Sequence, residues 1–171
     1  MTRRLAIGIA ILWIVVPAAG AGPRPQTMPP SPSPTPIPGP VVDDVIPPFD
    51  AEGMAGSPVH VDFPKGSKTI LVFFLSGCPH CHKMIPEWNR AYEHRSANLT
   101  VLGVLMDREP PGFFQVMPVS FPVIRSPSAT FLHSLKIRTA PVTMRVEAGG
   151  KVTDVGIGEL DGIRLGQLFA P

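Results

Sequence analysis

The only two cysteines of this 171-residue chain stand three positions apart, in the sequence Cys78-Pro79-His80-Cys81. Two thiols at this spacing can pass between a dithiol and a disulfide. In that chemistry a thiolate at Cys78 attacks another disulfide, and Cys81 then attacks the resulting mixed disulfide and releases the product. The residue types therefore predict a redox centre in which Cys78 is the attacking thiol and Cys81 is the resolving thiol.

The flanking sequence predicts that this pair lies where a buried strand meets a helix. Residues 69–75 are continuously apolar, β-branched or aromatic, which indicates a central strand buried on both faces. A helix is expected from about residue 79 to residue 94, and Pro79 suits its first position. The free N–H groups of its first turn would favour the thiolate of Cys78, and His80, if directed at Cys78, would stabilise that thiolate further. We therefore assign Pro79 and His80 as residues that tune the reactivity of Cys78.

Three other interpretations of the cysteine pair are open. A structural disulfide across so small a loop would constrain the unfolded chain little. Residues 78–82 also match the Cys-x-x-Cys-His sequence of c-type haem attachment, although the strands and helices predicted around it are typical of a redox fold. Copper or zinc could bind the cysteines together with His80, His82 or the distant His133, but no second ligand pair stands at a recognisable spacing. We expect a redox-active disulfide, and we assign no metal ligand and no cofactor.

The rest of the pattern predicts an α/β fold. A strand over residues 99–106 follows the helix, so strand, helix and strand form a unit with a parallel strand pair. Gly149-Gly150 separates two strand-like stretches and signals a hairpin. The other expected elements are a short helix at 113–117, an extended piece at 121–125, a helix at 128–135, hairpin strands at 141–147 and 152–157, and a final helix at 161–169.

The folded domain is predicted to span residues 49–171, with two different segments before it. Two arginines, an apolar run at residues 5–16 and then small residues make residues 1–21 a signal peptide or an N-terminal membrane anchor. Residues 22–48 carry eleven of the 23 prolines and predict a disordered, proline-rich linker. The net charge of +2 is no basic excess, so we expect no nucleic-acid partner.

The order of elements and the cysteine pair at a strand-to-helix turn resemble the thioredoxin superfamily. Pro86 stands five residues after the second cysteine, where family members kink the helix, and Thr139-Ala140-Pro141 matches the cis-proline that faces the cysteines. The long segment between Leu99 and Pro141 resembles the central insert of the TlpA/ResA-like exported branch. The resemblance implies a thioredoxin-like fold, a central mixed sheet flanked by helices with a short central insert. It also implies that Ala140 and Pro141 position the substrate.

The same resemblance implies a thiol–disulfide oxidoreductase that is periplasmic or otherwise exported, monomeric, and either soluble or tethered to the membrane by its N-terminus. Its partners would be protein thiol or disulfide clients and a membrane redox partner. The exported branch favours a reductase, such as one that keeps apocytochrome thiols reduced in cytochrome c biogenesis, whereas Pro79-His80 is a dipeptide of DsbA-like oxidases and leaves oxidase or isomerase activity open. Thioredoxins bury an acid where Val72 stands, so no proton acceptor for Cys81 is assigned. A copper- or haem-binding protein on this scaffold is the alternative function.

Overall fold

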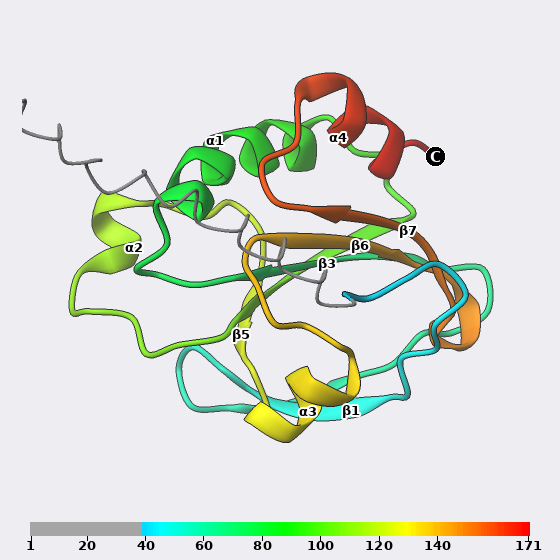
Figure 1. The fold of residues 1–171 in the computed structure, drawn as a ribbon, viewed down its shortest axis with the longest axis horizontal. Coiled ribbons are helices and arrows are strands. Elements are labelled where there is room, and N and C mark those ends of the chain that lie inside the picture. The colour runs from blue at the N-terminus through cyan, green and yellow to red at the C-terminus, as the bar shows by residue number, and fades with distance from the viewer. Residues whose placement is uncertain (1–38) are drawn as a thin grey trace, which may run out of the picture. The chain divides into compact units, whose positions relative to one another are not determined.

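One mixed sheet organises the computed structural model, which describes residues 39–171 (Figure 1). The described strands are β1 (Phe49–Gly53), β2 (Pro58–Val61), β3 (Lys68–Phe74), β4 (Leu99–Leu105), β5 (Val123–Arg125), β6 (Val142–Val146) and β7 (Val152–Ile157). Their order across the sheet is β2-β1-β5-β4-β3-β6-β7. β3 pairs in parallel with β4, and β4 with β5, while the other neighbouring strands are antiparallel.

Helices cover both faces of this sheet. The described helices are α1 (Pro79–Glu93), α2 (Phe113–Val116), α3 (Ala129–Ser134) and α4 (Gly162–Leu168), with a 3-10 turn at Ala148–Gly150. In Figure 1, α1 and α4 lie on one face and α3 on the other. The two hydrophobic clusters of the core follow the same division, because one includes residues of α1 and α4 and the other is contacted by residues of α3.

β3 is the central strand that the sequence predicts. Its side chains alternate between the two clusters: Ile70, Val72 and Phe74 face α1 and α4, whereas Leu71 and Phe73 face the opposite side. All five are completely buried, which explains why the run shows no polar alternation. The predicted fold class, a mixed sheet flanked by helices, is confirmed. The C-terminal end of β3 leads through a short turn into α1.

The sequence patterns located most elements and missed the first hairpin. The predicted helices at 79–94, 113–117, 128–135 and 161–169 and the predicted strands are confirmed, with bounds that differ by one or two residues. β1 and β2 were not predicted. They lie toward one edge of the sheet and carry exposed polar side chains, among them Asp50, Glu52 and His60, so no continuous apolar run marks them.

The predicted boundary of the linker at residue 48 is wrong by about ten residues. Ile46 is only 1% exposed and lies in the core, and its N–H donates to the carbonyl of Gly150 at 2.8 Å. The N–H of Asp43 likewise donates to the carbonyl of Val152 at 2.9 Å. The proline content concealed an apolar segment that pairs with the chain entering β7. The predicted signal or anchor, and linker residues 22–38, lie outside the described residues.

Replacing Ile46 with alanine tests whether this segment belongs to the domain. We expect Ile46→Ala to lower the free energy of unfolding by about 2–5 kcal/mol, because it empties a buried site. Val45→Ala is the matched control, since the Val45 side chain is 63% exposed, and it should change stability little. Chemical denaturation of both variants measures the difference. Equal, small effects would mean that the segment is not part of the folded core.

Candidate active site

Cys78 is the N-cap residue of α1, in the turn that follows β3. Its backbone is extended, with φ −90° and ψ 116°. The N–H of Cys81 donates to the Cys78 sulfur at 3.4 Å, and the Cys78 thiol donates to the carbonyl oxygen of Ala140 at 3.7 Å. The sulfur therefore lies where the free N–H groups of a helix stabilise negative charge. The predicted position of the pair, between a buried strand and a helix, is confirmed.

Cys81 has a different environment from Cys78. Its side chain is completely buried, whereas Cys78 is half-buried. Burial raises the pKa of the Cys81 thiol to about 12, and the Cys78 side chain and the negative charge of Asp107 act in the same direction. A backbone hydrogen bond at Leu75 opposes them. Of the two cysteines, Cys78 is therefore the one that is partly exposed to solvent.

The predicted cis-proline lies beside the cysteines. The Ala140–Pro141 peptide bond is cis and immediately precedes β6. The carbonyl of Ala140 contacts the Cys78 sulfur, and the carbonyl of Pro141 accepts a hydrogen bond from the N–H of Gly158 at 2.9 Å. The structure thus brings Cys78 next to Ala140 and Pro141, which stand about sixty residues later in the sequence. Pro86 lies inside α1, as expected.

His80 is not directed at Cys78. Its Nδ1 lies 2.5 Å from Oε1 of Glu159, in the loop between β7 and α4, and Nζ of Lys83 lies 2.9 Å from the same oxygen. Both contacts hold the pKa of Glu159 below its usual value, and the contact with His80 has the larger effect. The direct contact that would let His80 stabilise the Cys78 thiolate is therefore replaced by a contact with the Glu159 carboxylate. Sequence reasoning missed Glu159, because no local pattern links it to α1.

Asp107 is a second residue that sequence reasoning missed. It follows β4, and its carboxylate accepts hydrogen bonds from the N–H of Ser76 at 2.9 Å and 3.1 Å and from the Ser76 hydroxyl at 2.9 Å. It therefore secures the turn that carries Cys78, and its charge raises the pKa of Cys81. A signal was present in the sequence, because parallel strands end at the same edge of a sheet and Asp107 directly follows the strand predicted next to β3.

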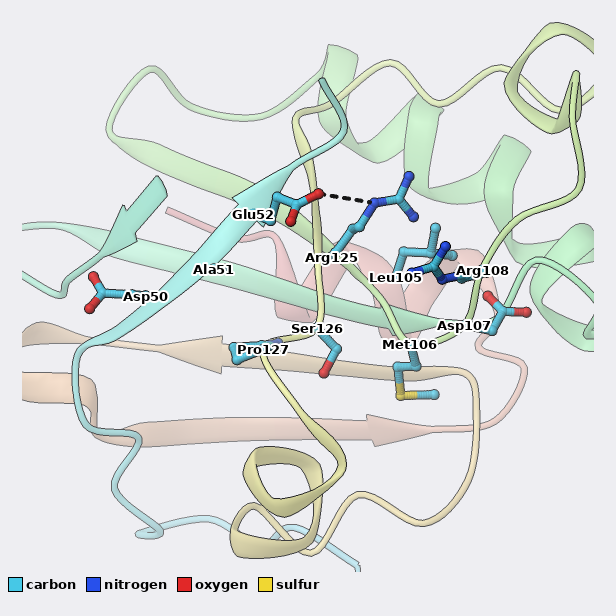
Figure 2. A pocket seen from close by; sticks show the side chains of 10 residues that line it. All are labelled: Asp50, Ala51, Glu52, Leu105, Met106, Asp107, Arg108, Arg125, Ser126 and Pro127. Atoms are coloured by element: carbon cyan, nitrogen blue, oxygen red, sulfur yellow. Dashed lines mark ion pairs between the residues drawn. The ribbon is translucent and has the colours of Figure 1, made fainter. Parts of the chain in front are cut away.

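A groove of about 550 Å³ lies beside Asp107 (Figure 2). It is lined by residues 50–52, 105–108 and 125–127, which come from β1 and from the ends of β4 and β5. Charged side chains border it, including Arg125, which pairs with Glu109 at 2.7 Å and lies 3.8 Å from Glu52. Asp107 thus lines this groove and also holds the turn of Ser76.

Comparison with known proteins places these features in a family. The model of the Redoxin family matches residues 41–164. The chain belongs to the Redoxin family. The match includes the cysteine turn, the cis-proline and the loop that carries Glu159, and it starts close to the first residues that pack on the domain.

Individual relatives of this Redoxin-family chain are distant. Sporulation thiol-disulfide oxidoreductase A of Bacillus subtilis (strain 168) is 27% identical over 103 residues, which is 56% of this chain and 62% of the relative. The match thus spans less than two thirds of that protein.

Solved structures share the thioredoxin-like fold. StoA from Bacillus subtilis superposes with a TM-score of 0.62 at 22% identity, over 73% of this chain and 98% of that one. A putative thiol:disulfide interchange protein DsbE from Chlorobium tepidum gives 0.64 at 22% identity, over 75% and 94%. The exposed lipoprotein thioredoxin Etrx1 of Streptococcus pneumoniae strain TIGR4 gives 0.61 at 20% identity, over 71% and 97%. The predicted thioredoxin-like fold is confirmed.

The histidines considered as metal or haem ligands have other partners in this Redoxin-family chain. His80 pairs with Glu159, as described above. His82 Nε2 lies 2.6 Å from the carbonyl oxygen of Ser76, and its ring packs on Phe113 with centroids 5.9 Å apart. His133 Nε2 lies 3.0 Å from the guanidinium of Arg138. Within residues 39–171, no three His, Cys, Asp or Glu side chains are grouped so that they could hold a metal ion.

Proposed function

We propose that this chain is an exported thiol–disulfide oxidoreductase that reduces protein disulfides through Cys78 and Cys81. The observation that carries the proposal is the asymmetry of the pair. Cys78 caps the first turn of α1 and is partly exposed, while Cys81 is completely buried, with its N–H bonded to the Cys78 sulfur. One thiol can meet a large substrate, and the other can meet only what is already attached to Cys78.

The reaction consists of two exchanges at sulfur. The Cys78 thiolate attacks one sulfur of the client disulfide, a mixed disulfide forms, and the first client thiolate leaves and takes up a proton. Cys81 then loses its proton and attacks the Cys78 sulfur, and the second client thiolate leaves. The client gains two electrons, and the protein gains a Cys78–Cys81 disulfide. A reduced dithiol of the membrane redox partner restores the starting state by the reverse pair of exchanges.

Ala140 and Pro141 position the client in this proposal. The carbonyl of Ala140 lies at the Cys78 sulfur, directly before the first residue of β6. An extended client segment that pairs with the backbone of Ala140, as an added strand does, would bring its disulfide to Cys78. The contact of His80 with Glu159 favours the reducing direction, because His80 then contributes less to the stability of the Cys78 thiolate. Apocytochrome thiols in cytochrome c maturation are the client class that the family resemblance favours.

Export is supported by the N-terminal sequence. Residues 1–21 have the charge, apolar run and small residues of a signal peptide or anchor, and residues 22–38 would then be a spacer. Among the structural neighbours, one is named an exposed lipoprotein thioredoxin and another a secreted disulfide oxidoreductase of Mycobacterium tuberculosis. No helix of residues 39–171 is long and apolar enough to cross a membrane. The exported chain acts as a monomer in this proposal.

Two measurements test the function. In glutathione buffers, we expect the Cys78–Cys81 disulfide to have a reduction potential nearer to the thioredoxin value of about −270 mV than to the DsbA value of about −120 mV. In the presence of dithiothreitol, the protein should accelerate the reduction of insulin. A potential near the DsbA value would reverse the proposed direction. A haem absorption band or stoichiometric copper in the purified protein would favour the alternative function.

A further inference from the structure

We propose that Glu159 is a positioning residue that holds His80 away from Cys78 and thereby keeps the reduction potential of the Cys78–Cys81 pair low. The inference rests on the proposed function. His80 follows Pro79 in the first turn of α1, so its ring is the basic side chain closest in sequence to the Cys78 sulfur. The structure places Nδ1 of that ring on the Glu159 carboxylate at 2.5 Å, whereas the Cys78 sulfur contacts the N–H of Cys81 and the carbonyl of Ala140.

The loop that carries Glu159 is attached at both sides. The N–H of Gly158 donates to the carbonyl of Pro141 at 2.9 Å, and the N–H of Leu160 donates to the sulfur of Met84 at 3.3 Å. Glu159 therefore stands between the cis-proline strand and α1, on two backbone anchors that do not involve its own side chain. This fixed position lets the carboxylate determine where the His80 ring lies, rather than follow it.

The same carboxylate oxygen also binds Lys83, at 2.9 Å. Glu159 thus contacts two basic side chains of the first turns of α1. A cation near a thiolate stabilises it, and a stabilised thiolate makes the disulfide more oxidising, because the reduced form is favoured. A carboxylate that binds these cations has the opposite effect. Glu159 would therefore offset the oxidising influence of a Pro-His dipeptide between the two cysteines.

The test is the equilibrium of the Cys78–Cys81 pair with glutathione at one fixed pH. In Glu159→Gln, which keeps the size of the side chain and removes its charge, the equilibrium should move by up to about tenfold toward the dithiol, equivalent to about 30 mV. Glu87→Gln is the matched control, because Glu87 is a carboxylate of α1 itself and pairs with Arg90 at 2.6 Å rather than with His80. That variant should leave the equilibrium unchanged.

A second pair of variants separates an effect of Glu159 that acts through His80 from a direct effect of the Glu159 charge on the cysteines. If Glu159 acts through His80, most of the shift should disappear when Glu159→Gln is combined with His80→Gln. A shift of the same size in both backgrounds would overturn the role of His80, and no shift in the wild-type background would overturn the inference as a whole. Failure of the wild-type pair to form a disulfide in glutathione would instead overturn the proposed function. Since Glu159 is 40% exposed, the variant is expected to fold, and thermal unfolding checks this.

Discussion

Replacing Cys78 with serine is expected to reduce the rate of insulin reduction to that measured without the protein. A hydroxyl at this position cannot attack a disulfide, and the buried Cys81 cannot reach a protein client in its place. Cys81→Ser should fail in a different way. Its Cys78 still attacks, but no neighbouring thiol resolves the product, so a mixed disulfide between Cys78 and the client accumulates.

Non-reducing electrophoresis and mass spectrometry of client complexes distinguish these two outcomes. The Cys81→Ser protein should form a covalent complex that thiol reductants release, and the Cys78→Ser protein should form none. Far-UV circular dichroism and thermal unfolding of both variants serve as the control for folding. Full activity of Cys78→Ser, or trapping through Cys81 instead of Cys78, would contradict the assignment of the attacking thiol.

In the folded, reduced protein, iodoacetamide is expected to modify Cys78 and to leave Cys81 nearly untouched at about pH 8. Only the thiolate reacts. The pKa of the Cys81 thiol is raised to about 12, mainly by burial. At about pH 8 it is therefore ionised in roughly one molecule in 10,000, against about one in four for an ordinary thiol with a pKa of about 8.5. Cys81 should therefore react at least several hundred-fold more slowly than it does in the unfolded chain.

The pH dependence of this labelling has a definite sign. In Cys78→Ser, the labelling rate of Cys81 should still rise by about tenfold per pH unit at pH values where an ordinary thiol is already fully ionised and its labelling rate no longer changes. Asp107→Asn should increase that rate at a given pH, because the negative charge of Asp107 contributes to the raised pKa of Cys81. Labelling in guanidinium provides the control, since both cysteines of the unfolded wild-type chain should react at similar rates. Equal labelling of both cysteines in the folded protein would contradict the buried position of Cys81.

The raised pKa of Cys81 also bears on the second step of the proposed reaction. Cys81 must lose a proton before it attacks the mixed disulfide, and Val72 stands where thioredoxins place an acid. Among the described residues, Asp107 is the carboxylate whose charge acts on Cys81, and it also lines the groove of Figure 2.

Local patterns predicted the central part of the fold well, for a physical reason. β3 is buried on both faces and α1 packs one face on the sheet, so each carries a strong hydrophobic signal over many residues. The hairpin of β1 and β2 carries a weak signal because one side of it faces solvent. The sequence signal of residues 39–48 is also weak. Their prolines indicate a linker, while the buried side chains of Pro40 and Ile46 and a few backbone hydrogen bonds attach them to the domain.

The sequence by itself determined the cysteine pair, its place at the junction of a buried strand and a helix, and the proline that faces it. These features depend on residue type, on short spacings and on burial patterns that repeat along the chain. Which charged side chains lie around the two cysteines was decided only by the tertiary structure. Glu159 meets His80 across 79 residues, and Asp107 meets Ser76 across 31. Such contacts arise from the order of strands in the sheet and from where the connecting loops cross its edge, and no local periodicity encodes which side chains will meet there.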